Sequence, residues 1–443
     1  MDRNEKLKHL PKTDRLMAKF EGFNQNLLKT AIRTTLDSIR ESAGDIPPEE
    51  TIMARVRTEY ERLRRGTLYK VINATGVPIH TNLGRSPIAE DVLKEAFGIA
   101  SGYSNLEYDT ARGKRGDRYH HAAEYLRILT DAEDAIVVNN NASAVFLILN
   151  TFAKSKEVIV SRGELVEIGG SFRIPDVMKG SGAKLAEIGT TNKTRIADYE
   201  DAVNGKTAMM MKVHRSNYAI QGFTEEAEFS EITSAAAKAG VISYYDAGSG
   251  LFTKILPESV CADITIPEVI KKGFDLVSFS GDKMLGGPQA GIIAGKKELI
   301  QKLKKNQLMR MLRVDKITLA LLQAVFRKYI EGTAGELPVN RMLSANPREL
   351  KAKAEKLAKM LPCKADIIET SSSIGGGSCP ASEIASYGVS PVTGKKPQAA
   401  ERLLRMNSVP VVARVSDDRL ILDVRTIDEA DFESVASAVK GLL

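Results

Sequence analysis

Two residues in the second half of the chain have the types and positions that amino-group chemistry requires. Asp246 follows the apolar run Val241–Tyr245, and Lys283 lies shortly after the apolar run Leu276–Phe279. Glycines flank the lysine, and glycine lets a ligand approach the backbone closely. Ligands of open parallel sheets collect beyond the carboxyl ends of the strands, so both side chains are candidates for one site.

A third candidate feature is the polar turn Asn139–Ser143, which lies between an apolar run ending at Val138 and a helix-length segment. Such a turn offers backbone N–H groups and the positive end of a helix dipole, which suit a phosphate group. The candidate residues are Asn140, Asn141 and Ala142. Simple helix capping by asparagine explains the same pattern, and Asp246 is open to a capping interpretation too.

Together these features match what pyridoxal 5′-phosphate needs. The lysine forms a Schiff base, and the aspartate keeps the pyridine nitrogen protonated so that the ring withdraws electrons. The lysine alone is weak evidence. The interpretation depends on the turn, the aspartate and the lysine following predicted strands in this order along the chain. Other cofactor sites lack their signatures. Gly205-Lys206-Thr207 resembles a P-loop end, but Glu200 replaces the first glycine, and no Gly-x-Gly-x-x-Gly opens a helix.

The elements that position these residues form an α/β pattern. Short runs rich in Val and Ile alternate with helix-length segments such as Ala142–Ala153 and Phe229–Ala239. The spacing predicts a mostly parallel sheet with helices on both faces. The expected strands are Ala135–Val138, Glu157–Val160, Ala208–Val213, Val241–Tyr245, Leu276–Phe279 and Gly291–Ala294.

A long helical zone, Lys296–Tyr329, ends this region, and a smaller α+β module follows. We expect a helix to Leu361, strands at Val409–Val415 and Arg419–Val424, and a closing helix from Ile427. The serine- and glycine-rich patch 371–378 is interpreted as a tight loop. The predicted domains are 1–66 (helical), 67–330 (catalytic, cofactor-binding) and 331–443 (small α+β).

Composition excludes several classes of protein. With 443 residues, 43% of them hydrophobic and 27% charged, the chain has the composition of a globular protein rather than a disordered one. The longest apolar stretch, Ala144–Leu149, is too short to span a bilayer, and no secretory signal opens the chain. Three scattered cysteines argue against a disulfide framework or a zinc site and favour a cytoplasmic location.

The amino-terminal region is basic and amphipathic. Residues 1–70 carry fifteen Lys and Arg against eleven Asp and Glu, a net charge of +4 out of +7 for the chain. Apolar residues recur at helical spacing from Leu16 to Ile39 and again from Ile52 to Leu63, with Gly66 as a stop. The arginines Arg55, Arg57, Arg62, Arg64 and Arg65 form either a solvated helix face or a surface for phosphate backbones.

Eight motifs resemble the bacterial selenocysteine synthase family, the L-seryl-tRNA(Sec) selenium transferases. They extend over essentially the whole chain: Ile72–Gly76, His80–Arg85, Asn105–Tyr108, Asn139–Asn141, Ser280–Lys283 with the tail Gly286–Gln289, Arg310–Lys316, Gly375–Gly377 and Leu420–Thr426. The resemblance implies a fold-type I pyridoxal-phosphate enzyme. It also implies a ring of dimers, with a decamer (a pentamer of dimers) as the expected assembly.

The activity implied by the resemblance is conversion of L-seryl-tRNA(Sec) to L-selenocysteinyl-tRNA(Sec) with selenophosphate. The amino group of the seryl ester displaces Lys283 from the cofactor aldimine, and the freed lysine removes the α-proton. Loss of the β-hydroxyl gives dehydroalanyl-tRNA, to which selenium adds. The resemblance places Asp246 and Asp282 beside Lys283 in catalysis, and His214 and Ser280 with the cofactor.

Arginine forks bind phosphate oxygens in pairs, which suits the multiply charged selenium donor. By motif, Arg85, Arg310 and Arg313 are the residues we expect to bind selenophosphate. For Arg310 and Arg313 an exposed basic helix face explains the same residues. Arg85 lies in a polar turn, Asn82–Pro87, which is the stronger position.

Several histidines and cysteines remain open. His214 either contacts the cofactor ring or is a satisfied core residue, and His80 supports the site or only the fold. The pair His120-His121 adjoins a basic turn, which indicates a solvated loop, although the resemblance places it near a subunit contact and the site. We expect Cys363 and Cys379 to be small core residues without a chemical role.

Three function hypotheses follow. The first is the tRNA-dependent selenium transferase. The second is a pyridoxal-phosphate enzyme for a free amino acid or amino sugar, such as the ammonia-lyases that share the core, but those relatives usually lack the amino-terminal helices. The third is a nonenzymatic RNA-binding protein, in which Asp246 and Lys283 have no purpose. Visible absorbance of a bound cofactor separates the third from the others, and assays with charged tRNA separate the first two.

Overall fold

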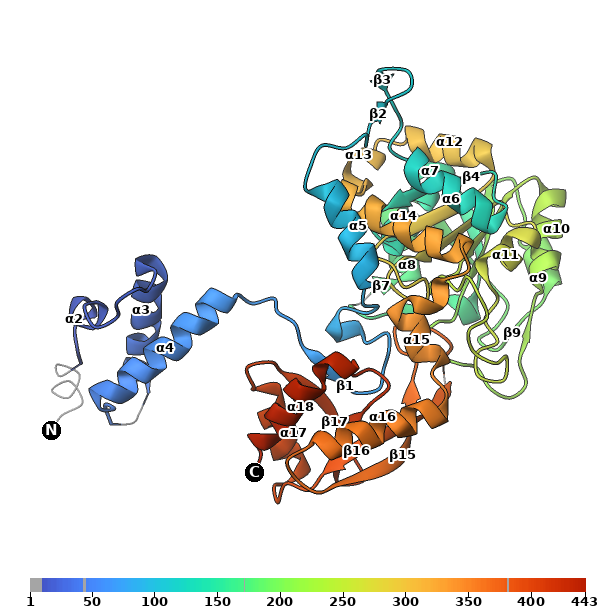
Figure 1. Cartoon of the computed structure of the whole chain (residues 1–443). Coiled ribbons are helices and arrows are strands. Elements are labelled where there is room, and N and C mark those ends of the chain that lie inside the picture. The colour runs from blue at the N-terminus through green and yellow to red at the C-terminus, as the bar shows by residue number, and fades with distance from the viewer. Residues whose placement is uncertain (1–9, 43–44, 171, 381) are drawn as a thin grey trace. The chain divides into compact units, whose positions relative to one another are not determined.

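The computed structural model describes residues 10–42, 45–170, 172–380 and 382–443 (Figure 1). The chain divides into two compact units, one up to Val71 and one from Ile72 to Leu443. No helix within the described ranges is long and apolar enough to cross a membrane.

The first unit is a small helical bundle, as the apolar spacing predicts. Its helices are α2 (Thr13–Met17), α3 (Gln25–Glu41) and α4 (Glu49–Arg65). Leu28, Ile32 and Val56 are fully buried in its own apolar core. The Asn24 side chain caps α3 by accepting the N–H groups of residues 26 and 27. Gly66, at φ +78°, ends α4, in a conformation that glycine adopts without strain.

A seven-stranded sheet forms the centre of the second unit. Its order is β4-β14-β13-β12-β10-β5-β8. Strand β14 is antiparallel to both of its neighbours, and the other pairs are parallel. The strands are β4 (Asp134–Val138), β5 (Glu157–Ser161), β8 (Lys184–Ile188), β10 (Thr207–Val213), β12 (Ile242–Asp246), β13 (Leu276–Ser280) and β14 (Gly291–Gly295). All six predicted strands are confirmed. Strand β8 was not predicted, because most of its residues are partly or fully exposed and it has no continuous apolar run.

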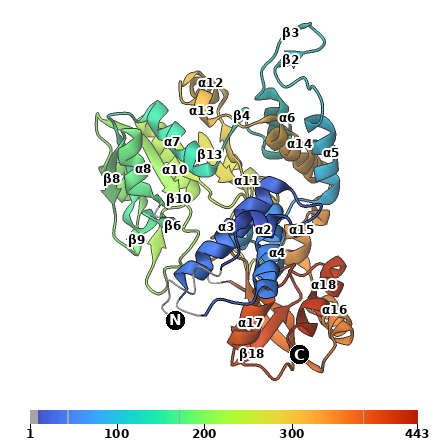
Figure 2. The same ribbon diagram turned by 90° about the vertical axis from the view of Figure 1, so that its left-hand side faces the viewer.

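Successive side chains of these strands enter two separate apolar cores. Val137 and Met210 belong to one core, whereas Val138 and Met211 belong to the other. The first core is covered by α5, α6, α10, α11 and α14, and the second by α7, α8 and α12. In Figure 2 the labelled strands β8, β10, β13 and β4 follow one another in the order of the sheet. The predicted α/β class with helices on both faces is confirmed.

The helices of this part are α5 (Glu90–Ala100), α6 (His120–Thr130), α7 (Asn141–Phe152), α8 (Ile174–Ser181), α9 (Ile196–Asp201), α10 (Phe229–Ala239), α11 (Ile266–Lys271), α12 (Lys297–Lys305), α13 (Met309–Leu312), α14 (Lys316–Ile330) and α15 (Pro338–Ser344). The zone predicted as helical from Lys296 to Tyr329 is therefore three helices. Breaks occur at Asn306 and Arg313, which both have extended backbones.

A second sheet contains five strands in the order β1-β17-β18-β16-β15. Its strands are β1 (Ile72–Ala74), β15 (Ala365–Ser373), β16 (Glu383–Pro391), β17 (Val411–Ser416) and β18 (Arg419–Asp423). The helices α16 (Pro347–Met360), α17 (Pro397–Arg405) and α18 (Phe432–Lys440) contribute to its apolar core. Strand β1 pairs in parallel with β17, so the start of the second unit lies in the same sheet as a strand from the last tenth of the chain.

The interpretation of residues 371–378 as a loop is wrong for the first three residues. Residues 371–373 belong to β15, which pairs antiparallel with β16 over its whole length. Both strands are rich in serine and small residues and partly exposed, so they lack the apolar run that identifies a buried strand. Only the glycine-rich part, from Ile374 onward, is a loop.

Asp423 joins two motifs that lie far apart in the sequence. It is completely buried and accepts hydrogen bonds from the Ser372 and Ser386 hydroxyls and from the Arg414 guanidinium. A Cβ at Gly76 would lie 2.3 Å from its carboxylate, so only glycine fits there. The motif Leu420–Thr426 thus fixes the path of the chain just before the polar turn at His80.

Candidate active site

The carboxyl edge of the seven-stranded sheet brings the predicted site residues together. Asn139 follows β4, His214 follows β10, Asp246 ends β12, and Lys283 follows β13. The parallel arrangement of β10, β12 and β13 puts their carboxyl ends at one edge. Val138 at the end of β4 pairs with Gly291, where antiparallel β14 begins, and this places the polar turn at the same edge.

Lys283 lies in the tight loop between β13 and β14, with only 6% of its surface exposed. Its backbone carbonyl accepts hydrogen bonds from the Ser86 hydroxyl and from the Gly286 N–H. Its amine makes no hydrogen bond or ion pair with any residue that the structure describes. Burial and the Arg85 cation lower the pKa of this amine, while the Asp282 and Asp246 carboxylates act in the opposite direction. A larger fraction of neutral, nucleophilic amine follows.

Asp246 is buried at the end of β12. Its carboxylate accepts a hydrogen bond from Asn141 Nδ2 at 2.7 Å and from the Gly248 N–H at 3.1 Å. Burial raises the pKa of this carboxyl, and the hydrogen bonds together with the Lys283 and His214 charges oppose the shift. A buried carboxylate in this state gains from a cationic partner. Asn141 Oδ1 is itself buried without a hydrogen-bond partner among the described residues.

The polar turn after β4 is built around helix α7. The Asn140 side chain accepts the Ser143 N–H at 2.9 Å, so the capping interpretation is confirmed for Asn140. Asn141 instead reaches Asp246, and Ala142 lies exposed in the first turn of the helix. The turn also packs tightly on β14, because a Cβ at Gly291 would lie 2.0 Å from the Asn140 carbonyl. A phosphate-binding role for this turn stays a prediction.

Ser280 is the last residue of β13 and is buried. Its N–H donates to the Gly248 carbonyl at 3.0 Å. This bond ties the start of the lysine loop to the turn that follows Asp246. Ser280 therefore has a geometric role in the site, and contact with a cofactor stays a prediction.

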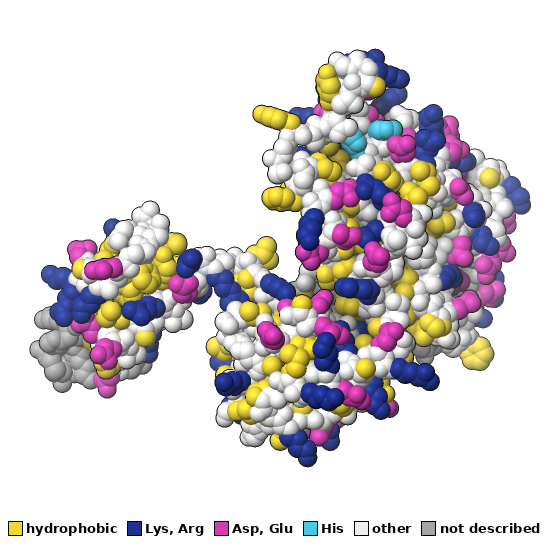
Figure 3. Space-filling view, in the orientation of Figure 1, with side chains coloured by type: hydrophobic (Ala, Val, Ile, Leu, Met, Phe, Trp, Pro, Cys, Tyr) yellow, Lys and Arg dark blue, Asp and Glu magenta, His cyan; other side chains and the backbone are white. Residues whose placement is uncertain are grey.

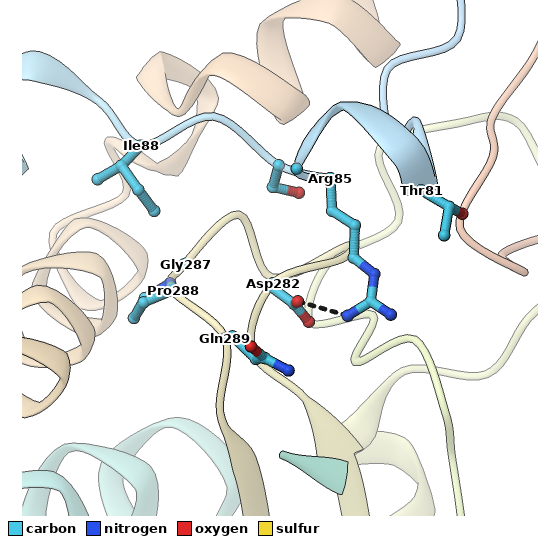
Figure 4. Close-up of a pocket in the computed structure, with 9 residues that line it drawn as sticks. Thr81, Arg85, Ile88, Asp282, Gly287, Pro288 and Gln289 are labelled. Atoms are coloured by element: carbon cyan, nitrogen blue, oxygen red, sulfur yellow. Dashed lines mark hydrogen bonds and ion pairs between the residues drawn. The ribbon is translucent and has the colours of Figure 1, made fainter. Parts of the chain in front are cut away.

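Arg85 forms an ion pair with Asp282, the residue that precedes Lys283. Arg85 Nη1 lies 2.6 Å from Asp282 Oδ2, and Figure 4 shows the two groups turned toward each other, with Gln289 nearby. They line a cavity of about 400 Å³ together with Thr81 and Gly287. Arg85 has a φ of +64°, a left-handed conformation that is uncommon for a residue other than glycine. The backbone is thus locally strained at the residue whose guanidinium contacts Asp282.

Arg310 and Arg313 lie on and just after helix α13, beside the turn that follows β4. The Leu312 carbonyl accepts the Asn139 N–H, and Arg313 makes an isolated β-bridge with Val138. Arg313 Nη1 lies 3.6 Å from a Glu107 carboxylate oxygen. The Arg310 side chain is exposed and has no polar partner within the part of the chain that the structure describes. The structure therefore places Arg313 next to the candidate phosphate turn, and the role of both arginines stays a prediction.

The histidines differ in environment. His214 Nε2 lies 3.1 Å from Asp263 Oδ1, and its Nδ1 is buried without a hydrogen-bond partner. His80 Nδ1 is also buried and unpartnered. His120 is exposed beside Glu124, but the loop expectation is wrong, because both His120 and His121 belong to the first turn of α6. His121 lies 3.2 Å from the Leu106 carbonyl. Among these four histidines, His214 alone has both a carboxylate partner and a position at the carboxyl edge of the sheet.

One disulfide is present, although three scattered cysteines argue against a disulfide framework. Cys261 and Cys379 are bonded, with their Cα atoms 5.3 Å apart, and Cys363 is free. A separation of 118 residues gives no sequence signal for this pair. The fold brings the loop after β12 against the glycine-rich loop, where Gly375 and Gly376 pack so closely on Ile79 that a Cβ at either position would overlap it. The disulfide therefore joins two loops that flank the site, and Cys379 is not an isolated core residue.

Two further features were missed. Asp263 lies in an irregular loop that offers no motif, and only the fold brings it to His214. Lys212, one residue before the end of β10, is buried between the Glu164 and Glu226 carboxylates at 3.0 Å from each. Side chains alternate along a strand, so Lys212 and His214 are expected on the same face. This alternation is the one sequence signal that could have linked Lys212 to the site.

The comparison with protein families decides the relationship. A family model described as L-seryl-tRNA selenium transferase matches residues 71–428, about four fifths of the chain. The chain belongs to this family. The match spans both sheets of the second unit, including every candidate residue from Arg85 to Arg313.

Curated members of the family resemble the chain along nearly its full length. It is 47% identical to the L-seryl-tRNA(Sec) selenium transferase of Aliarcobacter butzleri, with 98% of each chain covered. Identity is 46% to the Nautilia profundicola protein of the same name, again over 98% of each chain. It is 48% to that of Aquifex aeolicus, over 88% of this chain and 87% of the relative. These alignments include the amino-terminal unit in the first two cases.

A solved structure shows the fold independently. The structure of D-glucosaminate-6-phosphate ammonia-lyase matches with a TM-score of 0.61 at 20% identity, over 86% of this chain and 97% of that one. At this identity the likeness concerns the fold alone. The predicted fold-type I architecture of pyridoxal-phosphate enzymes is confirmed.

Proposed function

We propose that this protein converts L-seryl-tRNA(Sec) to L-selenocysteinyl-tRNA(Sec), with selenophosphate as the selenium donor and pyridoxal 5′-phosphate as the cofactor. The observation that carries the proposal is the buried Lys283 amine, which has no polar partner among the described residues and lies at the same sheet edge as the buried Asp246, whose charge influences its pKa. Membership of the L-seryl-tRNA selenium transferase family supports the reaction.

The residues present fit pyridoxal phosphate. A neutral buried amine suits an aldehyde carbon, and the buried Asp246 carboxylate suits a cationic ring nitrogen. The N-terminus of α7, with Asn140 and Ala142, suits the phosphate. The orphaned Asn141 Oδ1 shows that the site has unused polar capacity between these groups. When bound, the cofactor supplies an electron sink for the α-carbon of the seryl group.

The roles of the chain's own residues follow from their environments. Lys283, with its lowered pKa, accepts the α-proton of the seryl ester. Asp246 holds a proton on the partner nitrogen, and a cation there offsets the burial that raises its pKa. Asn141 orients Asp246 through the 2.7 Å hydrogen bond. Ser280 and Gly248 keep the two loops at a fixed distance.

Selenophosphate binding is assigned to the cationic side of the site. Arg85 lines the cavity of about 400 Å³, and Asp282 pairs with it and limits its motion. Arg313 and Arg310 approach from α13, next to the turn after β4. Guanidinium groups bind phosphate oxygens in pairs, which suits a small multiply charged anion.

The first unit is assigned to tRNA. Its arginines Arg55, Arg57 and Arg64 are exposed along α4, and Figure 3 shows basic side chains gathered on part of this unit's visible surface beside acidic ones. A further division of the second unit near residue 330, as in the three-domain organisation predicted from the sequence, is part of this proposal. Because its substrate is an aminoacyl-tRNA, we place the protein in the cytoplasm.

A homo-oligomer is proposed from exposed apolar side chains on the second unit. Leu93, Phe97, Tyr103 and Ile128 are all more than 45% exposed, on or next to α5 and α6. Apolar surface of this kind on a folded protein indicates a surface for another copy or partner. A decamer built of five dimers is the expected assembly.

The test is direct. Incubating the protein with pyridoxal phosphate, seryl-tRNA(Sec) and selenophosphate should yield selenocysteinyl-tRNA, identified after hydrolysis of the aminoacyl ester. Lys283→Ala should lose both the product and the visible absorbance of the bound cofactor, whereas Lys238→Ala, on the exposed face of α10, should keep them. Turnover of free serine or an amino sugar instead of seryl-tRNA(Sec) would replace this assignment by the ammonia-lyase alternative.

A further inference from the structure

His214 lies between a carboxylate on one side and the candidate active site on the other. Its Nε2 is 3.1 Å from Asp263 Oδ1, and its backbone N–H donates to the Asp246 carbonyl at 2.9 Å. Its Nδ1 is buried and has no hydrogen-bond partner in the described structure. A buried ring nitrogen without a partner is costly, so the position of this ring requires an explanation.

The unpartnered nitrogen is on the side of the Asp246 turn. Nδ1 is 3.7 Å from the position that a Cβ of residue 248 would occupy. The N–H of Gly248 is one of the two donors to the Asp246 carboxylate. His214 Nδ1 is thus adjacent to the group that we assign to the cofactor's ring nitrogen.

Asp263 is held in place from the opposite direction. The backbone N–H of Cys379 donates to its carboxylate, and Cys379 Sγ lies 3.6 Å from Oδ2. Cys379 is bonded to Cys261, two residues before Asp263, so the carboxylate lies within a cross-linked pair of loops. Burial opposes ionisation, but the His214 hydrogen bond and charge, the Cys379 N–H and Lys254 outweigh it and lower the pKa of Asp263.

An ionised carboxylate only accepts hydrogen bonds, so the proton between the two side chains belongs to Nε2. In a neutral imidazole, Nδ1 then carries a lone pair, and in the cation it carries an N–H. In the neutral ring, Asp263 therefore fixes the tautomer in which Nδ1 presents its lone pair toward the Asp246 turn. This logic is the same as for a carboxylate that orients a catalytic histidine in unrelated enzymes.

We propose that Asp263 is a positioning residue that fixes the ring orientation and the tautomer of His214, so that Nδ1 contacts the bound cofactor or the seryl group. The inference rests on the proposed function for the identity of the ligand. It assigns a role to a residue that belongs to none of the sequence motifs, and it gives His214 a function through Nδ1 rather than through Nε2.

The experiment compares Asp263→Asn, His214→Gln and the double variant in the cofactor-loaded protein. An amide in place of the carboxylate either donates or accepts, so the tautomer is no longer fixed. We expect each single variant to lower kcat by at least roughly tenfold, as loss of orienting partners commonly does. The KM for seryl-tRNA(Sec) should stay nearly constant, and the double variant should be no worse than His214→Gln alone.

A second measurement does not depend on turnover. Titration of each apoprotein with pyridoxal phosphate, followed by visible absorbance, should show a changed absorbance maximum or weaker binding in both single variants, without further change in the double variant. Glu258→Gln, an exposed carboxylate in the same loop, is the matched control and should behave like wild type. Asp263→Glu, which keeps the charge, should restore part of the activity.

Two results overturn the proposal. One is wild-type absorbance and kcat in Asp263→Asn. The other is a double variant whose losses multiply, because then Asp263 acts independently of His214. Failure of the cofactor assignment looks different, since wild-type protein itself would then show no visible band on titration.

Discussion

A buried amine and a buried carboxylate that do not neutralise each other are the main feature of the site at the scale of single residues. Lys283 and Asp246 are both at least 90% buried, and no direct ion pair joins them in the described structure. Burying charges without such a pair costs several kcal/mol per group, which a protein accepts where the groups have chemistry to perform.

Replacing Asp246 separates cofactor binding from catalysis. Asp246→Asn keeps the size of the side chain but removes the charge that keeps a ring nitrogen protonated. We expect a visible cofactor band with roughly a hundredfold lower rate of elimination, the scale of losing one preorganised charge partner. Rapid-mixing assays with seryl-tRNA(Sec) measure this rate, and Asp201→Asn, on the exposed end of α9, is the control. An unchanged elimination rate would show that another group protonates the ring.

The pH dependence of cofactor capture follows from Lys283. Burial and Arg85 lower the pKa of its amine, so capture by the apoprotein should rise with pH and level off below 10.5, the ordinary lysine value. Arg85→Gln removes a cation that lowers this pKa and also frees the Asp282 charge that raises it. Both changes move the midpoint to higher pH.

Stopped-flow absorbance at a series of pH values measures this midpoint. Arg348→Gln, exposed at the start of α16, should leave it unchanged. A midpoint that stays constant or moves to lower pH in Arg85→Gln would contradict the assigned electrostatics.

At the scale of elements, the sequence predicts the strands that consist of continuous apolar runs. It does not predict the strands that lack such runs. The buried strands β4, β10 and β13 follow from continuous runs of Val, Ile, Phe and Met. The partly exposed β15 and β16 contain serines and small residues, so their sequences lack the apolar run that identifies a strand. Asp246 and Lys283 were found because they follow buried strands, whereas Asp263 lies in a loop whose position depends on tertiary contacts.

The disulfide is likewise a tertiary feature with a measurable consequence. Denatured, unreduced protein should show one free thiol, Cys363, and three after reduction. A cross-link across 118 residues stabilises the folded state by up to roughly 4 to 5 kcal/mol in the chain-entropy model. Reduction should therefore lower the unfolding temperature, while Cys363→Ser should leave the effect of reduction intact. Three free thiols before reduction would exclude the bond.

At the scale of the whole molecule, the first unit has its own core, which permits its removal. Deleting residues 1–66 should leave a folded, cofactor-loaded protein, because Lys283 and its neighbours all lie in the second unit. That protein should lose binding of seryl-tRNA(Sec), measured by gel-shift titration. Equal binding by both chains would assign the tRNA to the second unit.

The same tRNA-binding role can be tested in the full-length chain by substituting arginines of α4. Arg55→Gln, Arg57→Gln and Arg64→Gln together should weaken binding and make it less salt-dependent. The slope of log K against log salt should decrease by about one for each phosphate group that the variant no longer binds. The pair Lys351→Gln and Lys359→Gln, exposed on α16, is the matched control. An unchanged slope in the arginine variant would show that α4 does not bind the phosphates.

Strand β1 has a consequence for synthesis on the ribosome. Residues 72–74 pair with 411–413, so this short strand waits for its neighbour until nearly the entire chain has been translated. The segment that follows β1 carries His80 and Arg85 to the carboxyl edge of the central sheet, and Asp423 encloses Gly76 at its base. The central sheet is complete once β14 has been synthesised, whereas the partner strand of β1 is synthesised only near the end of translation. An incomplete chain that already contains Lys283 thus still lacks the strand pairing that holds the start of the segment carrying Arg85.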